Sequence, residues 1–126
     1  MYAAIVTGSN GQDGMYLQEL LESKGYVVKC FGRRDDILNY SNVCACISEY
    51  VEHDRIEIYN LAAQGYVGIH TKMTYELNTL GLLNILEAVK QLKIDEKCKI
   101  FQASSSEIFG SVDEVPQNER TLYNPT

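Results

Sequence analysis

The sequence of 126 residues contains no tryptophan, only 2 prolines and 2 histidines, and no long apolar run. With so little proline and a 45% share of hydrophobic residues, the chain is neither collagen-like nor of disordered composition. No segment approaches the roughly 18 apolar residues of a membrane-spanning helix. The N-terminus also lacks the basic segment that opens a secretion signal. We therefore expect a globular protein in the cytoplasm, with a length typical of one domain.

Basic residues are in the minority. Lysine and arginine number 11 against 17 aspartates and glutamates, which gives a net charge of −6 and a pI of about 4.8. Nucleic-acid backbones and anionic membranes attract basic surfaces, so this balance argues against either as the main partner.

Metal-binding cysteine patterns are absent as well. The four cysteines are Cys30, Cys44, Cys46 and Cys98, and they form no CxxC pair. We expect no zinc site, and we expect the cysteines to be small buried side chains in a reducing compartment.

Short apolar segments alternate with segments of helical periodicity. Strands are predicted at residues 2–7, 26–31, 56–61 and 99–103. Helices are predicted from the first glycine-rich loop to Gly25, over Val43–Val51 with Ser41 or Asn42 as cap, and, as the longest, from about Thr74 to Leu92. The alternation predicts an α/β domain with a parallel sheet and helices on both faces.

A glycine-rich stretch joins the first strand to the first helix. It consists of Gly8, Ser9, Asn10, Gly11, Gln12, Asp13 and Gly14. The pyrophosphate of a dinucleotide requires a tight turn and close backbone approach at a helix N-terminus. We assign Gly8 to the turn, Gly11 to the approach of the ligand and Gly14 to contact between helix and sheet. The alternative is a glycine-rich turn that binds nothing.

Two arginines follow the second strand, where nicotinamide cofactors are distinguished. An acidic residue here binds the ribose hydroxyl of NAD, whereas arginine accommodates the 2′-phosphate of NADP. Arg33 and Arg34 therefore favour NADP, because a guanidinium binds phosphate with two hydrogen bonds. Asp35 and Asp36 follow directly and leave an alternative open, since they could repel that phosphate or bind a ribose hydroxyl.

Four segments carry a resemblance to a known family. They are residues 5–14 (IVTGSNGQDG), the Arg33–Arg34 pair, residues 58–64 (IYNLAAQ) and residues 102–110 (QASSSEIFG). Together they resemble the GDP-mannose 4,6-dehydratase family of the extended short-chain dehydrogenase/reductase superfamily. The resemblance covers essentially the whole chain, but only the N-terminal part of such an enzyme.

The resemblance implies a Rossmann-like fold and NADP as cofactor. Residues 1–126 would form one partial NAD(P)-binding domain of about four strands, without the outer edge strand, the C-terminal strands and the substrate domain. The implied cofactor contacts are Gly8 to Gly14, Arg33, Arg34, Asp36, Ile37, Leu61, Ala62, Ala63 and Gln64. Among these, Asp36 and Ile37 would pack on adenine, and the last four would form a floor of small residues.

The resemblance also implies a lyase that converts GDP-mannose to GDP-4-keto-6-deoxymannose. Ser105 would share the hydrogen bond of the sugar C4 hydroxyl, and Ser106 would bind the substrate. Glu107 would move the C5 proton to the leaving C6 hydroxyl. An extended turn would aim Ser105 and Glu107 at one sugar. Without the other motifs, such residues are more often a serine-rich turn and a solvated surface carboxylate.

The sequence departs from the family in two places. After Arg34 the family has a long loop and a further strand, which are missing here. The family's Tyr-x-x-x-Lys pair is also missing, because none of the 9 tyrosines has a lysine four positions later. We therefore expect these 126 residues alone to be inactive. The alternatives are a non-catalytic remnant, an NADP-binding partner of an intact homologue, or another nucleotide-sugar dehydratase or epimerase. The resemblance also implies a homo-oligomer as one expected assembly state, because the superfamily commonly dimerises.

Overall fold

The computed structural model describes residues 1–62, 76–104, 106–111 and 114–124. Within them, one parallel sheet of four strands has the order β2-β1-β3-β4. The strands are β1 (Tyr2–Thr7), β2 (Val27–Phe31), β3 (Arg55–Asn60) and β4 (Cys98–Gln102). Each lies within one residue of its predicted position, so the prediction of a parallel sheet is confirmed.

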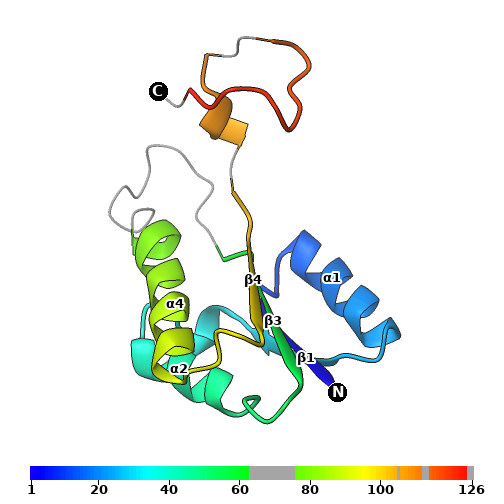
Figure 1. The fold of residues 1–126 in the computed structure, drawn as a ribbon, viewed down its shortest axis with the longest axis vertical. Coiled ribbons are helices and arrows are strands. Elements are labelled where there is room, and N and C mark those ends of the chain that lie inside the picture. The colour runs from blue at the N-terminus through cyan, green and yellow to red at the C-terminus, as the bar shows by residue number, and fades with distance from the viewer. Residues whose placement is uncertain (63–75, 105, 112–113, 125–126) are drawn as a thin grey trace.

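Helices cover both faces of the sheet, as predicted (Figure 1). Helix α1 (Gln12–Ser23) lies on one face, and α2 (Tyr40–Ser48) and α4 (Gly81–Gln91) lie on the other. A π-helical turn, η2 (Glu76–Leu80), leads into α4, and short 3-10 turns follow β2 (η1, Arg33–Asp35) and β4 (η3, Ser106–Phe109). None of the helices in the described ranges has the length and hydropathy needed to cross a membrane.

Two helix predictions are wrong in detail. The cap of α2 is Asn39, whose side chain accepts a hydrogen bond from the Asn42 backbone N–H at 3.2 Å, so the cap is neither Ser41 nor Asn42. Helix α4 has 11 residues against 12 in α1, because the preceding five residues take the wider π turn. The predicted start of that helix, near Thr74, lies outside the described residues.

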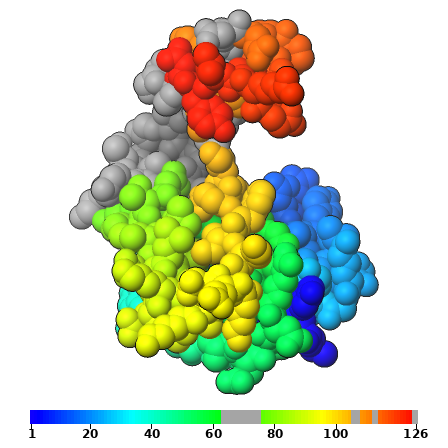
Figure 2. Space-filling model, in the orientation of Figure 1, coloured from blue at the N-terminus to red at the C-terminus, as the bar shows by residue number. Residues whose placement is uncertain are grey.

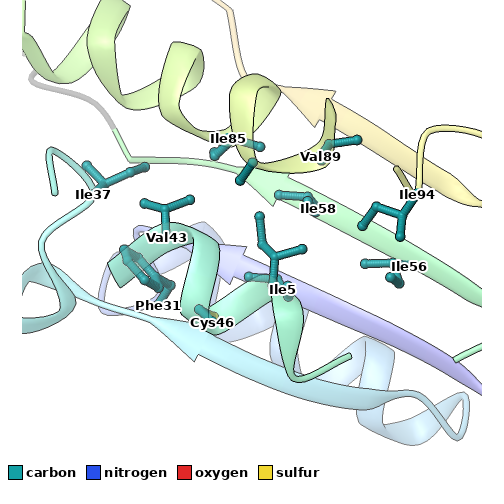
Figure 3. Packing of buried hydrophobic residues seen from close by; sticks show 12 residues of the cluster. Ile5, Phe31, Ile37, Val43, Cys46, Ile56, Ile58, Ile85, Val89 and Ile94 are labelled. Atoms are coloured by element: carbon teal, nitrogen blue, oxygen red, sulfur yellow. The ribbon is translucent and has the colours of Figure 1, made fainter. Parts of the chain in front are cut away.

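The main core lies between the sheet and the pair α2 and α4 (Figure 3). Alternate strand residues point to one face, so Ile5, Ile56 and Ile58 meet Ile85 of α4 and Val43 of α2. A fully buried aliphatic side chain of this size contributes about 1.5–3 kcal/mol. A smaller cluster of Ala4, Val6 and Leu21 fixes α1 to the opposite face.

The cysteines are only partly as expected. All four are free thiols; Cys46 is buried, and Cys44 and Cys98 are half-buried. Cys30 is exposed, so the expectation of burial is wrong there. Its strand, β2, is the edge of the sheet, and a strand with one neighbour gives its side chains less cover.

A buried carboxylate organises the face of the sheet that α1 covers. Glu57 accepts hydrogen bonds from the hydroxyls of Tyr26 at 3.0 Å and Tyr59 at 2.6 Å. The Arg55 Nε atom lies 2.7 Å from the same carboxylate. Burial, reinforced by the hydrogen bond to Glu57, raises the pKa of Tyr59 to about 12. The neutral phenol is therefore part of the folded structure.

This network predicts a stability change for Tyr59→Phe. The variant loses a hydrogen bond to a charged acceptor, and we expect its free energy of unfolding at pH 7 to fall by about 1–2 kcal/mol. A phenol whose pKa is higher in the folded state stabilises the protein below pH 10, its ordinary pKa, and loses that effect as pH rises towards 12. The difference between wild type and variant in urea unfolding should therefore shrink between these two pH values.

Tyr16→Phe is the matched control, since Tyr16 is 63% exposed on α1 and lies outside the Glu57 network. The free energy of unfolding of this variant should match that of wild type at every pH. A difference between wild type and Tyr59→Phe that stays constant with pH would contradict the role assigned to the Tyr59 phenol.

Candidate functional site

A chain of polar side chains ties together the carboxyl ends of three strands. The buried Thr7 hydroxyl at the end of β1 donates to Asn60 Oδ1 of β3 at 2.6 Å. Asn60 Nδ2 in turn donates to Gln102 Oε1 of β4 at 2.7 Å. These bonds satisfy polar groups that burial would otherwise penalise, and they hold the strand ends at one level. Sequence reasoning missed this role of Asn60 and Gln102, although polar residues ending two buried strands were a usable signal.

The glycine-rich loop rests directly on these strand ends. Gly8 has a φ of +65°, and a Cβ there would lie 2.8 Å from the carbonyl carbon of Leu61. A Cβ on Gly14 would lie 2.6 Å from the Gly8 carbonyl oxygen and 2.9 Å from the Cα of Ser9. Side chains are therefore excluded at both positions by the fold itself.

Gly11 differs from the other two glycines. It is exposed, its φ is −77°, and the one atom near a Cβ built on it is the Gly8 oxygen at 3.4 Å. Gly11 is also the N-cap of α1, which has no side-chain cap. The backbone N–H groups of the first turn, with the positive end of the helix dipole, therefore face an open surface where an anion can bind.

The other candidate residues of this loop flank the open surface. Ser9 is buried, and its carbonyl oxygen accepts a hydrogen bond from Gln18 Nε2 at 2.9 Å, which fixes the loop to α1. Asn10, Gln12 and Asp13 are exposed. The loop thus combines a rigid backbone with side chains that are accessible to a ligand.

The arginine turn lies next to this loop. The Gly8 backbone N–H donates to the Phe31 carbonyl at 3.1 Å, and a Cβ on Gly32 would lie 3.2 Å from the Asn10 side-chain nitrogen. Arg33 and Arg34 are both exposed in η1. Across the described part of the chain, neither forms an ion pair. Two exposed arginines, with no carboxylate partner among the described residues, therefore occupy the turn next to the glycine loop.

Both acidic residues after the arginines bind backbone groups. Asp35 Oδ2 accepts from the Gly32 N–H at 2.7 Å. Asp36 has a φ of 56°, and its Oδ1 accepts from the Leu38 N–H at 3.2 Å. The two carboxylates therefore have local partners and do not neutralise the arginines by direct contact.

Ile37 differs from the expectation that it packs on adenine. Its side chain is 6% exposed and belongs to the core between α2 and α4, with its methyl groups 3.4 Å from a Cβ built on Gly81. Its carbonyl oxygen accepts from Asn84 Nδ2 at 2.9 Å. The side chain is buried because the direct connection from η1 to α2 draws it under α4, so little of it can meet a ligand.

The floor and the turn after β4 are described in part. The backbone N–H groups of Leu61 and Ala62 donate to the Thr7 hydroxyl at 3.1 and 3.2 Å, which places these two residues below the loop. Ser106 and Glu107 open η3, so the backbone there is a 3-10 turn and the expected extended turn is wrong for these residues. Ala63, Gln64 and Ser105 lie outside the described residues.

The surface is hollowed between the start of α1 and the segment that follows β4. Figure 2 shows this hollow between the blue N-terminal region and the orange and red C-terminal segment. The strand ends, the glycine loop and the chain leading to η3 all border it (Figure 1). In open parallel sheets, ligands bind outside the carboxyl ends of the strands, which is the location of this hollow.

The chain is similar in sequence to known proteins. Residues 33–126 match a family model described as GDP-mannose 4,6 dehydratase. The GDP-mannose 4,6-dehydratase of Vibrio cholerae is 35% identical over 149 aligned residues, covering 97% of this chain and 40% of its own length. The human GDP-mannose 4,6 dehydratase is 35% identical over 150, with the same coverage. The chain thus spans about 40% of the length of these relatives.

Solved structures show the same fold. The UDP-glucose 4-epimerase of Brucella ovis, solved with NAD, matches with a TM-score of 0.85 at 20% identity, over 100% of this chain and 42% of its own. The dTDP-4-dehydrorhamnose reductase of Bacillus anthracis, solved with NADP, matches with a TM-score of 0.64 at 30% identity, over 78% and 34%. The fold of this chain is Rossmann-like. Because the family model matches three quarters of the chain's length, the chain belongs to the GDP-mannose 4,6 dehydratase family.

Proposed function

We propose that this chain is the NADP-binding part of a GDP-mannose 4,6-dehydratase, a lyase that makes GDP-4-keto-6-deoxymannose. The observation that carries the proposal is the contrast among the three loop glycines. Gly8 and Gly14 are required by backbone contacts, whereas nothing in the described fold prevents a side chain at Gly11. A glycine that the fold does not need, at the uncapped start of a helix, is explained by the close approach of a pyrophosphate.

The candidate residues fit the different parts of the cofactor. The first-turn N–H groups of α1 would hold the pyrophosphate, with Ser9, Asn10, Gln12 and Asp13 around it. Leu61, Ala62, Ala63 and Gln64 would form the floor, and Asp36 with the backbone of Ile37 would border the adenine. Membership of the family supports this assignment.

NADP is favoured over NAD by the arginine turn. A 2′-phosphate beside η1 would meet two exposed guanidinium groups, and a charge-assisted hydrogen bond contributes about 1.5–3 kcal/mol. The carboxylates of Asp35 and Asp36 are hydrogen-bonded to backbone N–H groups, which makes them weak competitors for those arginines.

The turn after β4 would carry the sugar chemistry. When bound, the nicotinamide would supply a reversible acceptor for the hydride that leaves sugar C4 and is given back at C6. Ser105 would hold the C4 hydroxyl, and Ser106 would orient the sugar. Glu107 would take the C5 proton, which the neighbouring C4 ketone acidifies, and deliver it to the departing C6 hydroxyl. In this proposal the protein acts in the cytoplasm, where its four free thiols stay reduced.

The contrast among the glycines predicts that binding and folding respond to different substitutions. Gly11→Ala should leave the free energy of unfolding within about 1 kcal/mol of wild type, since the new methyl group meets one atom at 3.4 Å. The same variant should weaken NADP binding at least tenfold in calorimetry. Gly14→Ala should instead destabilise the fold by about 1–3 kcal/mol, because its methyl group overlaps the loop backbone. Unchanged NADP affinity in Gly11→Ala would exclude this loop as the pyrophosphate site.

Arg33 and Arg34 should set the choice of cofactor. Replacing both with alanine should weaken NADP binding about tenfold to a hundredfold, from the loss of charge-assisted hydrogen bonds. The affinity for NAD should change less than about twofold. Lys90→Ala, which removes an exposed charge from the last turn of α4, is the control and should affect neither cofactor. Equal losses for NADP and NAD would show that the arginines do not contact the 2′-phosphate.

A polypeptide of residues 1–126 should bind NADP without turning over GDP-mannose. It contains no Tyr-x-x-x-Lys pair to take the proton of the C4 hydroxyl. Incubation with NADP and GDP-mannose, followed by mass spectrometry, should give no 4-keto-6-deoxy product above a control without protein. Product formation would refute the need for that pair, and absence of NADP binding would favour a non-catalytic remnant.

A further inference from the structure

Asp35, the acidic residue that closes the arginine turn, makes contacts to which neither the proposed function nor the family assigns a role. Asp35 is half-buried, and its side chain turns back towards the start of its own turn. Its Oδ2 accepts from the Gly32 N–H at 2.7 Å, while its own N–H donates to the Gly32 carbonyl at 3.0 Å. This reciprocal pair encloses Arg33 and Arg34 in a single turn.

The turn is fixed to the rest of the protein at both ends. On one side, Gly32 lies against the Asn10 amide of the glycine loop. On the other, Asn42 of α2 donates from its side-chain nitrogen to the Asp35 carbonyl oxygen at 3.0 Å. Asp35 therefore takes part in three of the hydrogen bonds that fix the arginine turn, through its carboxylate, its N–H and its carbonyl oxygen.

We propose that Asp35 is a positioning residue that holds Arg33 and Arg34 for the 2′-phosphate, and so sets the preference for NADP over NAD. This inference rests on the proposed function. It assigns Asp35 the opposite effect from simple charge repulsion. A carboxylate within one residue of a phosphate-binding pair would weaken phosphate binding by its charge alone, whereas a carboxylate that closes the turn strengthens binding by reducing the freedom of the arginines.

Two substitutions separate these effects. Asp35→Asn removes the charge but keeps a side-chain oxygen that can accept from the Gly32 N–H. Asp35→Ala removes both. The control is Glu19→Gln, which removes one exposed negative charge from α1 at a residue with no proposed role in cofactor binding.

The experiment measures NADP and NAD binding by calorimetry on wild type and the three variants. Asp35→Ala should weaken NADP binding about fivefold to tenfold, the factor expected for loss of a cap, with NAD binding changed less than about twofold. Asp35→Asn should retain NADP affinity to within about threefold. Tighter NADP binding in both Asp35 variants would overturn the proposal in favour of charge repulsion, and equal weakening for both cofactors would overturn it in favour of a purely structural role.

A second measurement keeps the inference separate from the proposed function. In the protein without nucleotide, the Gly32 amide should be protected from hydrogen exchange in wild type and Glu19→Gln, and it should exchange faster in Asp35→Ala. Unchanged exchange in Asp35→Ala would overturn the positioning role whatever binds. Failure of wild type to bind NADP would refute the proposed function. It would also refute the cofactor preference assigned to Asp35, whatever the exchange rate of the Gly32 amide.

Discussion

The contact between Gly8 and the backbone after β3 determines the geometry of the whole site. The space that a Cβ of Gly8 would need is filled by the Leu61 carbonyl, so the loop after β1 touches the neighbouring strand end backbone to backbone. Gly14 makes a similar contact within the first turn of α1, against Gly8 and Ser9. These close contacts fix the position of the start of α1 relative to the sheet. A binding site for a rigid group requires such a fixed position.

The Thr7 hydroxyl extends this constraint across the sheet. It donates to Asn60 and accepts from the N–H groups of Leu61 and Ala62, so one oxygen connects β1 to the floor of the site. The Ala103 N–H donates to the Asn60 carbonyl at 3.2 Å, and this bond carries the connection to the chain that leads into η3. The loop proposed to bind pyrophosphate and the turn proposed to act on the sugar therefore share one hydrogen-bonded base.

Much of this arrangement could be predicted from the sequence because it depends on local patterns. Apolar runs gave the strands to within one residue, and the glycine loop was placed by its position between a strand and a helix. Side-chain partners could not be predicted in the same way. Asn39 caps α2, and the carboxylate of Asp35 accepts from the Gly32 N–H. Several neighbouring polar side chains could make such hydrogen bonds, and only the folded backbone decides which of them does.

The connection between β2 and α2 is short and consists largely of the 3-10 turn η1. The alignment with the Vibrio cholerae enzyme spans 149 residues, more than the 126 of this chain, so the relative has additional residues inside the matched region. Here η1 runs directly towards α2, and β2 is left as the edge of the sheet. β2 is five residues long with Lys29 at its centre, and both features oppose pairing with another strand. The same short connection leads Ile37 into the core, and within η1 the Asp35 carboxylate reaches Gly32 three residues earlier. Asp35 therefore holds the arginine turn directly before the chain enters α2.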